Sequence, residues 1–343
     1  MKPLRQLMDK LYSVKLLSGP FKPALDAFDE VLFGTAKTTE AGPHITDHLD
    51  VKRYMTFVIF ALVPSAIASV YFFGRSALFM IAVSYVVGGA VEVLFGVIRK
   101  KDIHEGFLVT GLIFPLVLPP TTPLWVVGVG VAFGTVFGKE VFGGTGRNIF
   151  NPALVGRLFI TIAFPAIMTT AWRMPFTDTI TSATPLTLYK SAGTITATMD
   201  LLLGKCAGSM GETFRIGIIL GGLFLIFTKV SNWRVPIFYL GSVVVLSFIG
   251  NSVIGERVAP PTFQLLAGGL LFGAMFMATD PVTSPYTKAG KCVFGILCGL
   301  LTVLIRSFSG YVEGVMFSIV IMNAFAPVID HIVVTAKYKQ VKA

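Results

Sequence analysis

The stretch YMTFVIFALVPSAIASVYFFG (54–74) carries no charged side chain and is long enough to cross a lipid bilayer as one helix. A spanning helix needs about 20 apolar residues, because the hydrocarbon layer is roughly 30 Å thick. Similar runs follow along the chain, at 77–98, 105–119, 123–142, 153–170, 214–229, 235–254, 263–279, 290–306 and 313–334. The sequence therefore predicts an all-α polytopic membrane protein with about ten transmembrane helices.

Composition favours a membrane protein over a soluble one. Of the 343 residues, 54% are hydrophobic and 13% are charged, whereas a soluble domain has about 25% charged residues. The formal net charge is +10, but the basic residues stand mostly at the ends of apolar runs. We therefore attribute the positive charge to membrane topology and expect no nucleic-acid partner. The three cysteines form no CxxC pair, so the sequence predicts no metal site.

Two of the runs contain helix-breaking residues. PLVLPP (115–120) puts three prolines at the end of the third run, and GKE (138–140) lies near the end of the fourth. We expect broken or half-length helices there. Such breaks are tolerated in a membrane only where protein or a polar cavity surrounds the backbone.

A weak internal repeat divides the chain. LIFPLVLPPTTP (112–123) and LLFGAMFMATDP (270–281) have the same length, follow a glycine and end in proline. Every second short loop is richer in Lys and Arg, and both termini fall on the same side of the membrane as these loops. Because Lys and Arg are more frequent in cytoplasmic loops, the sequence predicts that both termini are cytoplasmic. The expected order is a cytoplasmic or interfacial segment (1–53), a first five-helix half (54–170), an outer-face loop (171–213), a second five-helix half (214–334) and a cytoplasmic tail (335–343). Transport folds of this kind place their sites between the repeats.

Acidic residues close to the apolar runs are candidates for function, because charges at membrane depth are costly. Asp280 is the strongest candidate, since Pro281 follows it and leaves backbone carbonyls free to join a carboxylate in a small-cation site. The alternative is that acids at the ends of apolar runs are ordinary interfacial residues, and it explains Glu313 and Asp330 equally well. The other candidates are Glu105 and Glu140.

Two further segments carry polar groups. GKEVFGGTGRNIFNPAL (138–154) contains Asn148 and Asn151, whose amides can start a helix or bind a flat polar ring; chemistry alone favours the helix cap. TDTITSATPL (177–186) is dense in hydroxyl groups, and no Ser–His–Asp set accompanies it.

The run DTITSAT (178–184) resembles the flavinylation signature Asp-x-x-Ser/Thr-Gly-Ala-Thr, in which FMN is attached through its phosphate to the last threonine. In this chain that residue is Thr184. Asp178, Thr181 and Ala183 match the signature, Pro185 and Leu186 fit the residues after it, and Ser182 stands where glycine is usual.

Six other segments extend the resemblance over nearly the whole chain after about residue 40. They are HLDVKRYM (48–55), EGFLVTGLIFPLVLP (105–119), GKEVFGGTGRNIFNPAL (138–154), GSMGET (208–213), MFMATDPV (275–282) and NAFAPVIDHIVV (323–334). Together they are similar to the NqrB/RnfD family. This family contains the B subunits of the sodium-translocating NADH:quinone oxidoreductases and, with less close similarity to this chain, the D subunits of the Rnf ferredoxin:NAD complexes.

This resemblance implies a bacterial inner-membrane protein with ten helices in two related halves. It implies covalent FMN at Thr184 on the outer side, a noncovalent riboflavin near Asn148 and Asn151, and cation or quinone handling by the five acids named above. The chain would belong to a six-subunit complex with an NADH-oxidising flavin and iron–sulfur subunit and a second FMN-carrying subunit. A flavin transferase would modify it, and electrons would pass through it to a quinone, coupled to sodium transport.

The chain has no NADH site or iron–sulfur ligand set of its own, so we expect no activity without partner subunits.

Two alternative functions stay open at this point. An Rnf-type role is the first alternative. The second is a flavin-free solute transporter, which explains the repeat and the acids but not residues 178–184.

Overall fold

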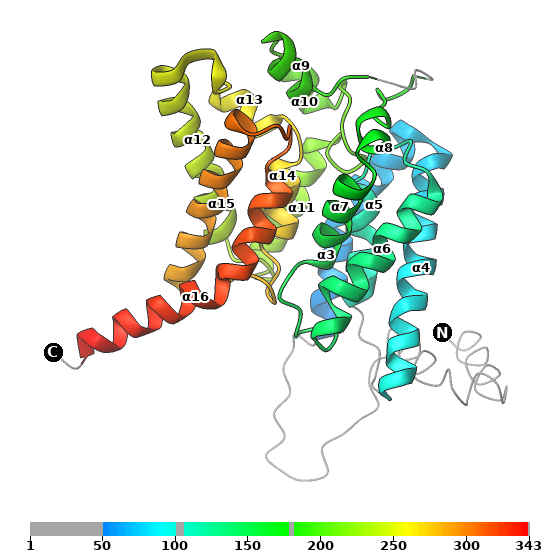
Figure 1. The fold of residues 1–343 in the computed structure, drawn as a ribbon, viewed down its shortest axis with the longest axis vertical. Helices are drawn as coiled ribbons and strands as arrows, with labels where there is room; N and C mark the ends of the chain where they lie inside the picture. The colour runs from blue at the N-terminus through cyan, green and yellow to red at the C-terminus, as the bar shows by residue number, and fades with distance from the viewer. Residues whose placement is uncertain (1–50, 101–105, 178–181, 342–343) are drawn as a thin grey trace.

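A computed structural model describes residues 51–100, 106–177 and 182–341. These residues form helices and connecting loops, and no strand occurs among them. In Figure 1 the chain makes two neighbouring groups of helices, α3–α8 and α11–α16, and the short helices α9 and α10 lie across one end. The C-terminal end of α16 lies at the opposite end of the molecule.

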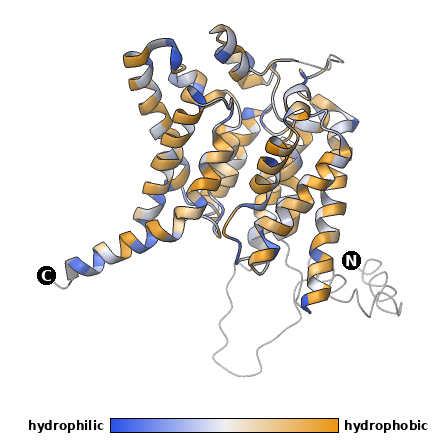
Figure 2. Ribbon diagram, viewed as in Figure 1, coloured by the Kyte–Doolittle hydropathy of each residue, from blue (hydrophilic) through white to orange (hydrophobic). Residues whose placement is uncertain are grey.

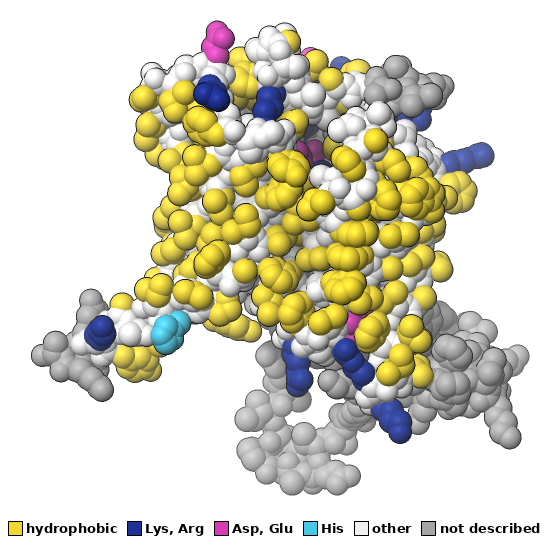
Figure 3. Space-filling view, viewed as in Figure 1, with side chains coloured by type: hydrophobic (Ala, Val, Ile, Leu, Met, Phe, Trp, Pro, Cys, Tyr) yellow, Lys and Arg dark blue, Asp and Glu magenta, His cyan; other side chains and the backbone are white. Residues whose placement is uncertain are grey.

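Six helical segments of the described chain are long and apolar enough to cross a membrane. They are Tyr54–Phe73 in α3 (Val51–Phe73), Arg75–Arg99 (α4), Leu124–Phe142 (α6 and η1), Arg234–Arg257 (α12 and η2), Lys288–Phe308 (α15) and Val315–Lys339 in α16 (Val315–Val341). Figure 2 shows that hydrophobic residues predominate along the middle of the long helices in view. Figure 3 shows a broad hydrophobic surface at mid-height, with Lys and Arg gathered toward the two ends. The prediction of an all-helical, multi-pass membrane protein is confirmed.

Three apolar helices are shorter than a bilayer is thick: α5 (Gly106–Leu116), α7 (Pro152–Ala163) and α11 (Arg215–Phe227). At 1.5 Å per residue, the 12 residues of α7 span about 18 Å, so its ends lie inside the protein rather than at both membrane surfaces. The breaks expected near the prolines and near GKE are present, because α5 stops at Leu116 and α6 (Leu124–Gly138) stops before η1 (Glu140–Phe142).

The eighth apolar run is also broken. It forms α13 (Pro261–Leu266), α14 (Leu270–Phe272) and the single π-helical turn η3 (Gly273–Met277), and then continues without regular structure to α15. The expected outer loop follows α8 (Pro165–Thr170) and contains the short helices α9 (Pro185–Ala192) and α10 (Thr198–Leu203). The last helix, α16, runs from Val315 to Val341, so it includes most of the expected tail.

Glycines let the helices approach closely. A Cβ atom on Gly134 of α6 would lie 2.4 Å from the Pro152 carbonyl oxygen, and one on Gly156 of α7 would lie 2.5 Å from the Gly130 carbonyl oxygen. Small residues at helix contacts are typical of membrane proteins, where packing rather than water exclusion drives association. The α6–α7 pair is therefore held at backbone contact, which fixes α7 in position.

Candidate functional site

Thr184 begins helix α9. Its backbone is extended, Pro185 occupies the first helical position, and its Oγ1 accepts a hydrogen bond from the Thr187 backbone N at 3.3 Å. Thr184 Oγ1 also lies 2.8 Å from Thr187 Oγ1. Threonine before proline is a favourable helix start, because the side-chain oxygen pairs with an otherwise free backbone N–H. The candidate attachment residue is thus held at a helix N-terminus by local sequence.

Thr184 lines a cavity at the end of the molecule that carries α9 and α10, which is called the outer cavity after the outer-face loop expected there. The cavity has a volume of about 420 Å³. Binding sites for drug-sized ligands are typically about 300–1,000 Å³, so a flat cofactor ring fits within this space. The wall includes residues from α7, α8, the 204–214 loop and the connection between α15 and α16, among them Arg157, Met168, Trp172, Ser182, Ala183, Pro185, Leu186, Glu212, Tyr311, Glu313 and Phe317.

Three charged residues of this wall form one cluster. Arg157 Nη2 donates to Glu313 Oε2 at 2.8 Å, whereas Arg157 Nη1 lies 3.9 Å from Glu212 Oε1, beyond hydrogen-bond distance. The other oxygen of Glu313 accepts from the Gly269 backbone N at 2.9 Å. Arg157 and Glu212 are each only 3% exposed. Glu313 therefore has both carboxylate oxygens paired, and Glu212 holds the weaker contacts.

The poor pairing of Glu212 has an electrostatic consequence. Its Oε2 accepts only a long bond, 3.4 Å, from the Ser209 backbone N. Burial and the nearby Glu313 carboxylate raise the pKa of Glu212 to about 7, although Arg157 and Arg215 oppose the shift. Glu212 can therefore take up or release a proton near neutral pH.

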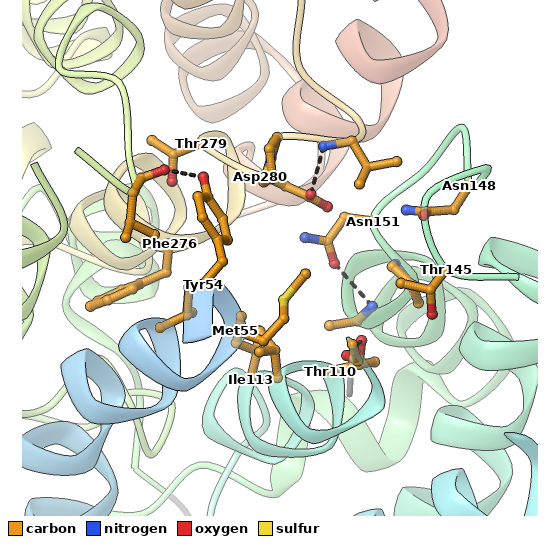
Figure 4. A pocket seen from close by; sticks show the side chains of 18 of the residues that line it. Tyr54, Met55, Thr110, Ile113, Thr145, Asn148, Asn151, Phe276, Thr279 and Asp280 are labelled. Atoms are coloured by element: carbon orange, nitrogen blue, oxygen red, sulfur yellow. Dashed lines mark hydrogen bonds between the residues drawn. The ribbon is translucent and has the colours of Figure 1, made fainter. Parts of the chain in front are cut away.

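A second, inner cavity lies at the opposite end, between α3, α5, α7 and the 278–282 segment. Figure 4 shows Asp280 and Asn151 on facing walls of this space, with Tyr54 and Thr110 nearby. Its volume is about 80 Å³. That is well below the range for drug-sized ligands and suits a few water molecules or a small ion.

The predicted amides and acid meet at this inner cavity. Asn151 Oδ1 accepts from the backbone N of Ala153 at 3.0 Å and of Leu154 at 3.4 Å, so it is the N-cap of α7. Asn148 Nδ2 donates to the Phe150 carbonyl at 3.2 Å. Asp280 Oδ1 accepts from the Val282 backbone N at 3.0 Å, and burial raises the pKa of the Asp280 carboxyl. The helix-cap interpretation of Asn151 is confirmed by this geometry.

Two ion pairs flank the inner cavity. Lys139, which lines the cavity, pairs with Glu92 of α4, and both side chains are buried. Glu140 pairs with Arg99 at 3.1 Å. The GKE segment after α6 is therefore tied to α4 through two charges of opposite sign.

The structure separates the remaining predicted acids. Asp330 accepts from the backbone N of Tyr286 at 2.6 Å and from the backbone N and Oγ1 of Thr287 at 3.0 and 2.5 Å, which fixes the start of α15. Glu313 lies at the outer cavity, whereas Asp280 and Glu140 lie near the inner one. The predicted residues Glu105, Asp178 and Thr181 fall outside the described residues.

Sequence reasoning missed three buried charged residues at the two cavities and their ion pairs: Arg157, Glu92 and Glu212. Arg157 and Glu92 each stand inside an apolar run, and that isolation was an available signal. Glu212 lies in GSMGET, just before a run, and nothing local distinguishes it from an ordinary loop residue.

Known proteins resemble this chain along almost its full length. A family model described as the NQR2, RnfD, RnfE family matches residues 38–339. Curated relatives, each named as the B subunit of a Na(+)-translocating NADH-quinone reductase, include those of Pseudomonas paraeruginosa (34% identical, 98% of each chain covered), Azotobacter vinelandii (36%, 98% of each) and Ectopseudomonas mendocina (37%, 92% of each). The chain belongs to the NQR2, RnfD and RnfE family.

Proposed function

We propose that this chain is the B subunit of a sodium-translocating NADH:quinone reductase and carries FMN in phosphoester linkage on Thr184. Curated relatives of that name, 34–37% identical over nearly the whole chain, support the assignment. The single observation that carries the flavin proposal is the position of Thr184 at the wall of a 420 Å³ cavity. A phosphoester link at this position would let the isoalloxazine ring of FMN enter the cavity.

The residues around Thr184 fit an FMN group. A phosphate on Thr184 Oγ1 would stand at the N-terminus of α9, where free backbone N–H groups favour negative charge. Lys190 of the same helix donates to the carbonyl oxygens of Ser309 and Tyr311, which ties α9 to the connection before α16. When bound, FMN supplies electron transfer, and the chain supplies its position and its electrostatic surroundings.

The inner cavity does not fit a riboflavin as the residues stand. Its volume is about 80 Å³, and the oxygen of Asn151 already caps α7. We assign this cavity to the transported cation, with Asp280 as the carboxylate that meets it. Moving a sodium ion outward against 100 mV costs roughly 2.3 kcal/mol per charge, so electron transfer must change the affinity or access of such a site.

The wider proposal follows the family. The chain would make ten crossings in two five-helix halves, with both termini cytoplasmic and α9 on the outer side of a bacterial inner membrane. Electrons would arrive from an NADH-oxidising flavin and iron–sulfur subunit and from a second FMN-carrying subunit, and would leave to a quinone. The family model also includes RnfD, so an Rnf-type subunit is the second candidate. Reduction of the purified complex by NADH or by ferredoxin distinguishes the two.

The test of the flavin proposal is the complex coexpressed with its flavin transferase and run on a denaturing gel. We expect the band of this chain to fluoresce and Thr184→Val to abolish that fluorescence completely. Thr187→Val is the matched control, because Thr187 Oγ1 is 2.8 Å from Thr184 Oγ1, and it should keep the band. A wild-type band without fluorescence would rule out covalent FMN.

A further inference from the structure

Two polar atoms in the wall of the outer cavity have no hydrogen-bond partner. They are Arg157 Nε and Glu212 Oε1, and both atoms are buried. Leaving such a group unpaired is destabilising, and folded proteins rarely do so without a reason. Both residues line the cavity that Thr184 also lines.

The two residues offer complementary chemistry side by side. A guanidinium only donates hydrogen bonds, and an ionised carboxylate only accepts them. Arg157 Nη1 and Glu212 Oε1 are 3.9 Å apart, so they form an ion pair in the same small area of the wall without a hydrogen bond between them. A ligand edge with a carbonyl next to an N–H group, such as the imide edge of a flavin's pyrimidine ring, matches this donor and acceptor.

The surrounding residues keep the pair available. Glu313 holds Arg157 through Nη2 at 2.8 Å and is itself fully paired, so it positions the guanidinium and does not compete for the ligand. A Cβ on Gly269 would lie 2.7 Å from Glu212 Oε1. A side chain at 269 would therefore press against that oxygen, and glycine leaves Glu212 room for its present position.

We propose that Arg157 and Glu212 bind the imide edge of the flavin ring tethered at Thr184, with Glu313 as the residue that positions Arg157. This inference rests on the proposed attachment of FMN to Thr184. It assigns the ring an orientation, with its pyrimidine side toward α7 and the 204–214 loop.

The orientation predicts opposite electrostatic effects for the two residues. Reduction increases the negative charge on the pyrimidine side of the ring, so the positive charge of Arg157 favours the reduced ring and the negative charge of Glu212 disfavours it. At a pH above the Glu212 pKa of about 7, where this carboxylate is ionised, removal of Arg157 should lower the midpoint potential and removal of the Glu212 charge should raise it. General damage to the cavity has no reason to produce opposite signs.

The test is a spectroelectrochemical titration of the FMN on this chain in the intact complex, for wild type, Arg157→Met and Glu212→Gln. We expect at least a tenfold change in the relative affinity for reduced and oxidised ring, which is about 59 mV for a one-electron couple. Glu256→Gln is the control, because Glu256 is exposed at the same end but outside this cavity, and it should give no shift. In-gel fluorescence checks that each variant carries covalent FMN.

Each outcome decides the inference. A downward shift in Arg157→Met with an upward shift in Glu212→Gln supports it. Normal covalent fluorescence with unchanged potentials, or with shifts of the same sign, overturns it and leaves the attachment at Thr184 standing. If Arg157→Met does not assemble, Glu212→Gln decides alone, and only an upward shift supports the inference. A wild-type chain without covalent flavin overturns both this inference and the proposed function.

Discussion

The outer and inner cavities differ in size and in how completely their charged groups are paired. The outer cavity has a volume of about 420 Å³ and leaves Arg157 Nε and Glu212 Oε1 without partners. The inner cavity has about 80 Å³; its Asn151, Asn148 and Asp280 side chains all make hydrogen bonds within the protein, and the Ser231 hydroxyl on its wall has no partner. Unpaired charged groups beside a large space indicate a ligand site, whereas a paired carboxylate and paired amides around a small space indicate a structural or ion-sized one.

One helix connects the two cavities. Asn151 caps α7 at the inner cavity, and Arg157 of the same helix reaches the outer one. The six-residue step between them corresponds to about 9 Å along a helix axis. Because α7 is one continuous helix, a movement of its end at one cavity would also move the residues that line the other. The contrast between the cavities can therefore be tested from both ends of this helix.

The largest effect is expected at the outer cavity. Arg157→Met leaves the buried Glu212 and Glu313 without their shared cation, and breaking a buried ion pair costs about 3–5 kcal/mol. We expect the free energy of unfolding of the chain in detergent to fall by about 3–5 kcal/mol. Adding Glu212→Gln and Glu313→Gln to Arg157→Met should recover most of the loss, since no uncompensated charge remains. A triple variant as unstable as Arg157→Met would mean that packing, not charge, gives Arg157 its role.

The second-largest expected effect is a pH dependence of stability that is caused by the titration of Glu212. Its folded-state pKa is raised to about 7 from the ordinary value of 4.5, chiefly by burial. Between pH 4.5 and pH 7 the folded protein therefore binds more protons than the unfolded chain. The contribution of Glu212 to the free energy of unfolding is complete below pH 4.5 and is lost as the pH rises through 7. At 1.36 kcal/mol per pH unit, the loss amounts to roughly 3 kcal/mol.

Thermal or denaturant unfolding of the chain in detergent, from about the unfolded pKa of 4.5 to one pH unit above the folded value of about 7, measures this contribution. Glu212→Gln cannot titrate and should flatten the profile, whereas Glu256→Gln, on an exposed residue at the same end, should keep the wild-type slope. Identical slopes for wild type and Glu212→Gln would show that Glu212 stays ionised in the folded protein.

The fold was largely predictable from hydrophobic run length, and the sites only partly. The runs at 54–74 and 77–98 became α3 and α4 because an apolar stretch of bilayer length has few alternatives to a helix. The prolines of PLVLPP ended α5 as expected, since proline removes a backbone donor. The continuation of α16 to Val341 was not foreseen, because Lys337 and Lys339 suggested a polar tail although lysine is compatible with a helix.

The sites depended on contacts between distant residues. Thr184 and Asn151 could be selected because a motif or a following proline distinguishes them locally. The pairing of Arg157 with Glu313 joins residues separated by 156 positions, and no local pattern encodes it. Cavity size is likewise a property of several helices together, so the sequence could place Asn148, Asn151 and Asp280 among the candidates without indicating how little space they enclose.

The smallest effect is expected at the inner cavity, where Asn151→Ala removes the N-cap of α7. Loss of an Asn cap costs about 0.5–2 kcal/mol, because the backbone N–H groups of Ala153 and Leu154 lose their acceptor. Asn148→Ala is the matched control: Asn148 lies on the same wall and makes one bond to a carbonyl, so its loss should cost less. If the inner cavity is ion-sized, neither variant should change the flavin content of the purified complex, measured after denaturation and extraction of noncovalent flavin. A selective loss of extractable flavin in Asn151→Ala would instead mean that the inner cavity opens to admit a ring, and the contrast between the two cavities would then reflect one conformation of a movable α7.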